Sequence, residues 1–341
     1  MTSVIEFGAF VPQGWRLDLV GIDPAAQWNA LSGVAKRLDD GAWDSLWVYD
    51  HMHTVPAPVK ESTFEAWSVM AALASSTSRI RLGQMCTSIG YRNPAFLAKI
   101  AATVDLISNG RLDFGIGAGW YEHEWRAYGY GFPGTGDRLA ALAEGVQIIQ
   151  RMWSEGSATL EGKHFSVEGA LCVPQPLQRG RDDLPHIPTW IAGAGEQRTL
   201  KYAARWADVT NFGGSAEHFT RKREILLEHC ERVGRDPATL RHSTNVNVIV
   251  RETESEAKAE YERVLERTNA VLPGASQNAA FSSASAIIGT PEQVAAQLLP
   301  LRDAGASIFI AYMPDVAYTH DGIDAFESAV MPLVREASPL R

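Results

Sequence analysis

The stretch that decides the fold is residues 112–124, LDFGIGAGWYEHE, in which an apolar run ends in alternating glycines before a helix-compatible segment. Glycine lets a backbone approach a bulky planar molecule without a Cβ in between, and free N–H groups at a helix start can face a ligand. Residues 45–53, SLWVYDHMH, repeat this form with titratable side chains. One of these strands ends in glycines and the other in titratable side chains. Together they predict a ligand site at one face of a parallel sheet.

Strand-like and helical runs alternate along the chain. We expect strands at residues 4–10, 45–49, 80–86, 112–116, 187–192, 208–212, 244–250 and 307–312. We expect helices at residues 25–39, 63–75, 94–108, 139–153, 197–204, 216–233, 254–271, 291–304 and 323–334. Eight mostly apolar strands with helices between them predict an α/β fold, a (β/α)8 TIM barrel formed by residues 1–341 as a single domain. A doubly wound sheet is the alternative.

Two segments interrupt this alternation. Residues 157–187 predict an insertion, in which residues 158–160 and 164–167 form a hairpin before a proline-bearing loop. Residues 269–284 are polar, small and poorly periodic, and we expect them to form a flap over the site.

Composition narrows the class of protein. The 341 residues are 45% hydrophobic and carry a formal net charge of -9, which argues against nucleic acid as a main partner. Cys86, Cys172 and Cys230 show neither a disulfide framework nor zinc spacing, as expected in a reducing compartment. The N-terminal residues lack the form of a signal peptide, and no apolar run is long enough to cross a bilayer. We therefore expect a cytoplasmic protein without a membrane partner.

Asp50 and His51 follow the second expected strand. They are suited to contact a cofactor or to move a proton, although the same segment is also suited to capping the next helix. A metal site that uses His51 and His53 is a third interpretation. It calls for a lysine at a middle strand and further histidines at strand ends, which the sequence does not offer, so we expect no metal.

The glycine stretches have both a binding and a structural interpretation. Gly115, Gly117 and Gly119 fall short of the dinucleotide fingerprint, because Trp120 occupies the place of its last glycine. Residues 190–196 run from a strand into glycines, and Arg198 follows in the first turn of a helix. This arrangement suits a phosphate group, and it equally suits a tight strand-to-helix turn.

The sequence resembles the bacterial luciferase-like monooxygenase family, and most of all its actinobacterial branch that uses the deazaflavin coenzyme F420. The motifs that carry the resemblance lie in order along nearly the whole chain. They are LWVYDH (46–51), EAW (65–67), AALA (71–74), RIRLG (79–83), YRNP (91–94), GAGW (117–120) with Glu124, RL (138–139) and AGAG (192–195).

The resemblance implies a barrel whose C-terminal mouth holds a flavin-type ring against a non-proline cis peptide bond between Met85 and Cys86. It implies a phosphate grip at residues 193–196, and it puts His123 where relatives often have asparagine. The implied cofactor-binding residues are Asp50, Met85, Cys86, Thr87, Gly117, Gly119, His123, Gly193, Ala194, Gly195 and Glu196. Trp120 stands where some sugar-phosphate dehydrogenases of this branch carry glutamate, which argues against that substrate.

We therefore expect an oxidoreductase that moves a hydride between F420 and a small organic substrate. His51 is the expected proton partner, oriented by Asp50, and Glu124 is the second choice. The alternative keeps the family and predicts an FMN-dependent monooxygenase that works with a separate flavin reductase. A ligand-binding barrel without turnover and a metal-dependent hydrolase are less favoured. The family resemblance also implies a homodimer or a larger homo-oligomer.

Overall fold

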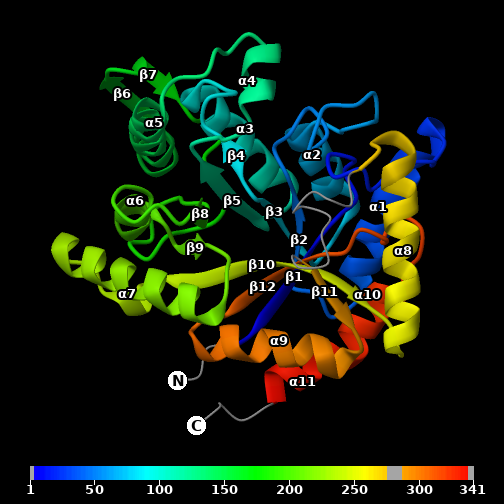
Figure 1. The fold of residues 1–341 in the computed structure, drawn as a ribbon. Helices are drawn as coiled ribbons and strands as arrows, with labels where there is room; N and C mark the ends of the chain where they lie inside the picture. Colours follow the sequence, from blue (N-terminus) through cyan, green and yellow to red (C-terminus); the bar gives the residue numbers. More distant parts are fainter. Residues whose placement is uncertain (1–3, 275–285, 337–341) are drawn as a thin grey trace.

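Parallel strands close into an eight-stranded barrel within the part of the chain that the computed structural model describes, residues 4–274 and 286–336 (Figure 1). Going round the barrel, the strands are β1 (Glu6–Phe10), β2 (Ser45–Val48), β3 (Arg81–Gln84), β5 (Leu112–Gly117), β8 (Thr189–Ala192), β9 (Val209–Asn211), β10 (Arg241–Val250) and β12 (Ile308–Tyr312). The pairing of β12 with β1, for example Phe309 with Phe7, closes the ring. The predicted (β/α)8 barrel is therefore confirmed.

Helices surround the barrel on its outer side (Figure 1). They are α1 (Pro24–Asp40), α2 (Ala66–Ser76), α3 (Pro94–Ile107), α4 (Glu122–Ala127), α5 (Thr135–Glu155), α6 (Thr199–Trp206), α7 (Ala216–Val233), α8 (Glu254–Val271), α9 (Pro291–Asp303), α10 (Asp321–Ala325) and α11 (Met331–Glu336). Their starts follow local signals. Asn93 caps α3 by accepting from the amide N–H groups of Ala95 and Phe96, and Thr290 forms a capping box with Gln293 at α9.

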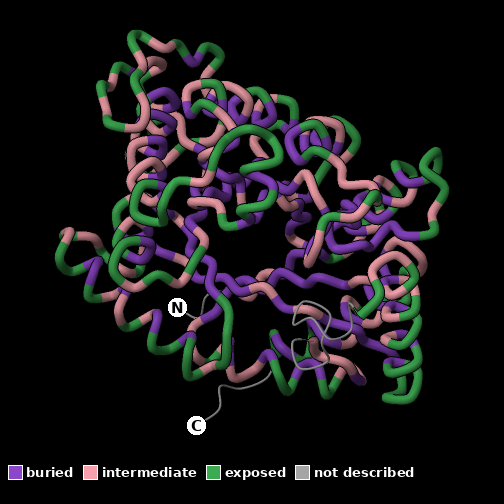
Figure 2. The backbone as a smooth tube through the Cα atoms, turned by 45° about the horizontal axis from the view of Figure 1, so that its top comes forward, coloured by how far each residue is buried: buried purple, intermediate pink, exposed green. Residues whose placement is uncertain are grey.

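The barrel interior is filled by large side chains, and buried backbone runs through the centre of the molecule (Figure 2). The interior cluster consists of Phe10, Trp47, Met85, Trp190, Val209, Ile308, Ile310 and Tyr312. Trp47 fits there because its neighbour on β3 is Gly83, where a Cβ would overlap the indole ring. The layer below the mouth is thus closed by side chains, so any ligand must bind above it.

The short strand β11 (Ala286–Gly289) was not predicted. It pairs in parallel with the second half of β10, as in Val250 with Gly289, whereas the first residues of β10 pair with β9. Residues 269–271 were predicted both as the end of a helix and as the start of a flap, and they form the end of α8. Residues 275–284 of that segment lie outside the described residues.

Residues 157–187, expected as an insertion, contain an antiparallel hairpin that lies beside α5 (Figure 1). Its strands, β6 (Ser157–Glu161) and β7 (Ser166–Leu171), are longer than the expected ones. A further two-residue strand, β4 (Thr87–Ser88), follows β3 and pairs with β5 at the mouth of the barrel. Among the described helices, none is long and apolar enough to cross a membrane.

Candidate active site

A cavity of about 510 Å³ opens at the C-terminal mouth of the barrel, above the loops that follow β1, β2, β3, β5 and β8. Its lining comprises Trp15, Tyr49, Asp50, His51, Met85, Cys86, Ser88, Tyr91, Gly117, Ala118, Gly119, Trp120, Thr135, Arg138, Leu139, Ala192, Gly193, Gly195 and Thr199. Parallel strands place their carboxyl ends on one face of a barrel, which is where such enzymes bind their ligands. The structure therefore brings most of the predicted site residues together.

The end of β3 contains the non-proline cis peptide bond that the resemblance implied. The peptide bond between Met85 and Cys86 is cis, and both residues line the cavity. Burial, with the nearby Asp50 charge, raises the pKa of the Cys86 thiol to about 12, so this cysteine is unsuited to act as a nucleophile. Thr87, predicted as a cofactor contact, is buried away from the lining and donates to Gln84; Ser88 lines the cavity in its place.

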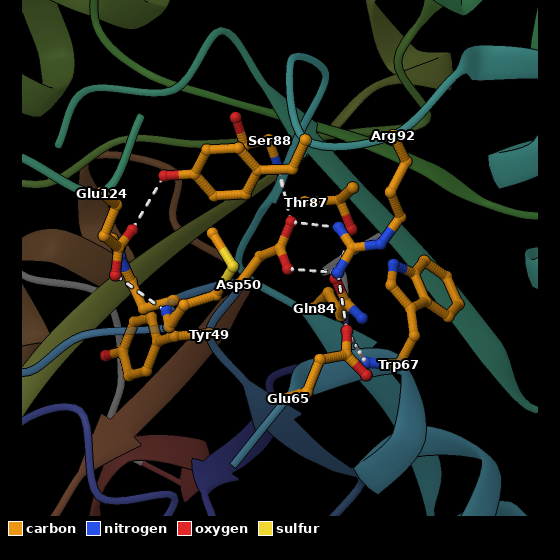
Figure 3. Close-up of polar contacts among 12 residues, drawn as sticks. Tyr49, Asp50, Glu65, Trp67, Gln84, Thr87, Ser88, Arg92 and Glu124 are labelled. Carbon is orange, nitrogen blue, oxygen red and sulfur yellow. Dashed lines mark hydrogen bonds and ion pairs between the residues drawn. The ribbon is translucent and has the colours of Figure 1, made fainter. Parts of the chain in front are cut away.

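Asp50 does not orient His51, and this part of the prediction is wrong. The Asp50 carboxylate accepts two hydrogen bonds from Arg92, at 2.7 and 2.9 Å, and one from the Ser88 amide at 2.9 Å. Figure 3 shows Asp50 held between Ser88 and Arg92, with Arg92 reaching on to Glu65. Both residues line the cavity, but Asp50 and His51 contact different partners.

Glu124 is the residue that holds His51. Its carboxylate lies 2.9 Å from His51 Nδ1 and accepts from the Tyr91 hydroxyl at 2.8 Å. It also accepts from the backbone N–H groups of Met52 and His53, each at 2.8 Å. Burial acts to raise the pKa of Glu124, but these hydrogen bonds outweigh it and hold the pKa below its usual value. Glu124 is therefore a buried carboxylate that stays ionised.

Two tryptophan rings contact the His51 imidazole. The Trp15 ring stacks on it at 4.2 Å with planes 7° apart, and Trp120 meets it edge-on at 5.6 Å. Because the ionised Glu124 accepts at Nδ1, that nitrogen carries a proton, and Nε2 is left to the cavity. A base with one fixed tautomer on an apolar wall can exchange a proton with a bound molecule.

The glycine loop after β8 reaches the cavity only in part. Gly193 and Gly195 line it, whereas Ala194 and Glu196 do not. Gly193 has a φ of 121°, and a Cβ there would lie 3.2 Å from the Thr199 methyl group. The Glu196 carboxylate instead forms ion pairs with Lys222, at 2.7 Å, and with Arg221.

The cation beside this loop is Arg138 of α5 rather than the predicted Arg198. Arg198 is exposed and donates to the Gly136 carbonyl, whereas Arg138 is buried and lines the cavity. Its guanidinium lies over the Phe132 ring at 4.0 Å. Arg138 falls within the RL motif at residues 138–139, and that motif was the signal available from the sequence.

His123 lies outside the cavity. It is exposed, and its ring packs near the rings of His53, at 5.0 Å, and Tyr121, at 5.9 Å. The residues that sequence reasoning missed include Trp15, Tyr49, Tyr91, Thr135 and Thr199. Trp15 lies on the long loop after β1, where nothing in the local sequence pattern marks it.

The cavity presents polar atoms suited to a bound group. Within residues 4–274 and 286–336, the buried Trp15 Nε1, Ser88 Oγ and Arg138 Nε have no hydrogen-bond partner. All three side chains line the cavity. Buried polar atoms without partners are costly, so they favour a ligand that supplies acceptors. A planar ring with an anionic tail fits this arrangement of apolar walls, glycine backbone and one arginine.

The fold and the site define a barrel with a cavity at its mouth and a His–Glu pair on the wall of that cavity. The sequence model of the family described as luciferase-like monooxygenase matches residues 5–307, and the chain belongs to this family. The enzymes that it resembles are oxidoreductases and monooxygenases.

Relatives include enzymes of two kinds. The F420-dependent glucose-6-phosphate dehydrogenase of Amycolatopsis mediterranei is 27% identical over 333 residues, which cover 88% of this chain and 93% of that protein. The pyrimidine monooxygenase RutA of Variovorax paradoxus is 30% identical over 209 residues, 59% of this chain. The match spans 53% of the monooxygenase's own length.

Solved structures share the fold. An F420-dependent secondary alcohol dehydrogenase, in complex with an F420-acetone adduct, superimposes with a TM-score of 0.74 at 20% identity and covers 97% of this chain and 99% of its own. The oxygenating component of 3,6-diketocamphane monooxygenase from Pseudomonas putida, in complex with FMN, gives a TM-score of 0.70 at 20% identity, with coverages of 96% and 98%.

Proposed function

We propose that this protein is an F420-dependent oxidoreductase that transfers a hydride between the deazaflavin and a small organic substrate. The observation that carries the proposal is the His51–Glu124 pair on the wall of a cavity, where the described residues Trp15, Ser88 and Arg138 each have a buried polar atom without a hydrogen-bond partner. The relative that aligns over most of the chain, an F420-dependent dehydrogenase, supports the choice of cofactor.

The residues that would hold the cofactor lie on two sides of the cavity. The backbone at Met85 and Cys86, with the Ser88 hydroxyl, is suited to the ring system. Arg138 and the backbone of the Gly193 loop are suited to the phosphate. When bound, the deazaflavin accepts or donates the hydride, and the chain positions it and manages the proton.

His51 would perform the proton transfer. For a substrate hydroxyl, Nε2 takes the O–H proton while the hydrogen on the neighbouring carbon leaves with its electron pair as hydride, so a carbonyl forms. In the reverse direction, His51 returns the proton to the carbonyl oxygen. Glu124 stabilises the imidazolium because its buried carboxylate is already ionised. Trp120 makes this wall apolar, which favours an uncharged substrate over a sugar phosphate.

The second candidate is an FMN-dependent monooxygenase that receives reduced flavin from a separate reductase. The observation that favours it is the FMN complex of the Pseudomonas putida enzyme, whose barrel superimposes on most of this chain. The same cavity and the same histidine would serve that reaction.

Two measurements test the proposal. Fluorescence titration with F420 and with FMN identifies the cofactor, and binding of FMN alone would replace the first candidate by the second. The variant His51→Ala should then lower turnover by about 10²–10⁴-fold and leave cofactor affinity nearly unchanged. The matched control is His53→Ala, which changes a neighbouring histidine outside the cavity lining. Unchanged turnover in His51→Ala would refute the proton assignment.

A further inference from the structure

Tyr91 lies on the short segment between β4 and α3, and the mechanism above gives it no role. Its side chain is buried, lines the cavity and stacks on the Tyr130 ring at 5.3 Å with planes 25° apart. The next two residues fix this segment, because Arg92 forms an ion pair with Asp50 and Asn93 caps α3. Tyr91 is therefore held in place on both sides, by packing and by its neighbours in the chain.

The Tyr91 hydroxyl and the His51 ring contact the same oxygen atom of Glu124. Tyr91 donates to Oε2 at 2.8 Å, and His51 Nδ1 lies 2.9 Å from that atom. The other oxygen, Oε1, accepts from the backbone N–H groups of Met52 and His53, each at 2.8 Å. A carboxylate offers about four lone-pair sites, so these donors use its whole capacity. Tyr91 and His51 consequently share the negative charge of a single oxygen atom.

The Tyr91 hydroxyl is the donor in this bond, because the phenol stays neutral. Burial raises the pKa of Tyr91, and the charge of Glu124 and the hydrogen bond to it act in the same direction. The charges of Asp50 and Tyr130 add to this rise. Burial also acts to raise the pKa of Glu124, but its hydrogen bonds, including the one from Tyr91, hold the pKa below its usual value. Other titratable groups around the pair include His53, Arg92, Tyr121 and His123.

We propose that Tyr91 is a positioning residue of the proton-transfer site and that it acts on His51 through Glu124. Its hydroxyl occupies one lone pair of Oε2, leaves the other to His51 Nδ1, and moderates how strongly the carboxylate holds the imidazole proton. Without that hydroxyl, Oε2 would give its full charge to His51, and the hydrogen bond between them would strengthen. The role in turnover rests on the function proposed above, whereas the sharing of Oε2 can be tested in the protein alone.

Proton NMR of the His51 Nδ1–H group tests this sharing in protein without cofactor, and the resonance is assigned by its loss in His51→Ala. Tyr91→Phe keeps the ring and removes the hydroxyl, so the resonance should move downfield, as for a stronger hydrogen bond. Replacement of Tyr91 by 3-fluorotyrosine makes the hydroxyl a stronger donor and should move the resonance upfield. The matched control is Tyr121→Phe, which should leave it unchanged. The Tyr121 hydroxyl donates to the Thr54 carbonyl at 2.9 Å, on a ring 6.0 Å from that of His51.

The pH profile of turnover gives a second readout. Loss of the Tyr91 hydroxyl makes Glu124 more basic, so His51 should keep its proton to higher pH. The acidic limb of kcat/KM for substrate oxidation, which requires a neutral His51, should therefore move upward by about half a pH unit in Tyr91→Phe.

An unmoved Nδ1–H resonance or an unmoved acidic limb in Tyr91→Phe would overturn the inference, as would an equal change in Tyr121→Phe. If Tyr91→Phe does not fold, the 3-fluorotyrosine protein decides, and a resonance that stays in place or moves downfield would overturn the inference. Failure of the protein to bind F420 or FMN would instead refute the proposed function and leave the NMR result standing, so the two failures are distinguishable.

Discussion

Two halves of the barrel mouth each contain a buried carboxylate, and the surroundings shift the pKa values of the two carboxylates in opposite directions. Glu124, beside the loops after β2 and β3, receives hydrogen bonds from His51, Tyr91 and two backbone N–H groups. Asp18, beside β1 and β12, receives one backbone N–H, from Gly14, and the Tyr312 hydroxyl. The pKa of Glu124 lies below its ordinary value, whereas burial raises the pKa of Asp18 to about 6.

The difference shows that burial alone does not decide the charge of a carboxylate. Four donors, one of them a histidine, compensate the lost hydration of Glu124, while two donors and the more distant charge of Arg16 do not compensate that of Asp18. Titratable groups whose surroundings separate their pKa values are often assigned different tasks. Glu124 is suited to stabilise a cation on His51, whereas Asp18 is suited to bind a proton at weakly acidic pH.

The largest expected effect follows from removing the charge of Glu124. Glu124→Gln should lower turnover by about 10²–10⁴-fold, because an amide can neither stabilise an imidazolium nor select the His51 tautomer. Cofactor affinity, measured by fluorescence titration, should stay close to that of the wild type. Glu122→Gln, on the exposed side of the same helix, is the matched control. Wild-type turnover in Glu124→Gln would show that the pair is only structural.

The third buried carboxylate of the mouth, Asp50, forms an ion pair with Arg92. Arg92→Met should lower the free energy of unfolding by about 3–5 kcal/mol, because it leaves the buried Asp50 charge without its cation. Arg126→Met breaks the exposed pair with Glu122 and should cost less than about 1 kcal/mol. Urea unfolding measures both values, and similar costs would mean that Asp50 is paired by other groups.

The barrel was predictable because its signals are local. Apolar runs end at glycines, and caps such as Asn93 and Thr290 mark helix starts without tertiary information. The strand β11 was missed because four residues, AIIG, carry too little pattern, and their pairing with the second half of β10 depends on where β10 leaves β9.

The candidate site was predictable where a motif marks it. The cis bond at Met85–Cys86 came from the family resemblance. The role expected for Asp50 failed because its partners, Arg92 and the Ser88 amide, come from the segment after β3, and the sequence does not show that the fold brings them there. Arg138 and Trp15 converge on the cavity from distant loops, and only the closed barrel brings them there.

The smallest of the expected effects tests the other half of the mouth through its dependence on pH. The folded protein raises the pKa of Asp18 from 3.8 to about 6, so it favours the protonated form. Stability from this group is complete below pH 3.8 and is lost as pH rises through 6, by roughly 3 kcal/mol in total. Asp18→Asn keeps the shape and removes the titration, with Tyr312 able to turn its hydroxyl into an acceptor. Urea unfolding at pH 4 and pH 8 should therefore show that the free energy of unfolding of the variant increases relative to that of the wild type as pH rises. If the difference in unfolding free energy between variant and wild type does not change with pH, Asp18 is ionised in the folded protein. The two halves of the mouth would then both hold an ionised carboxylate.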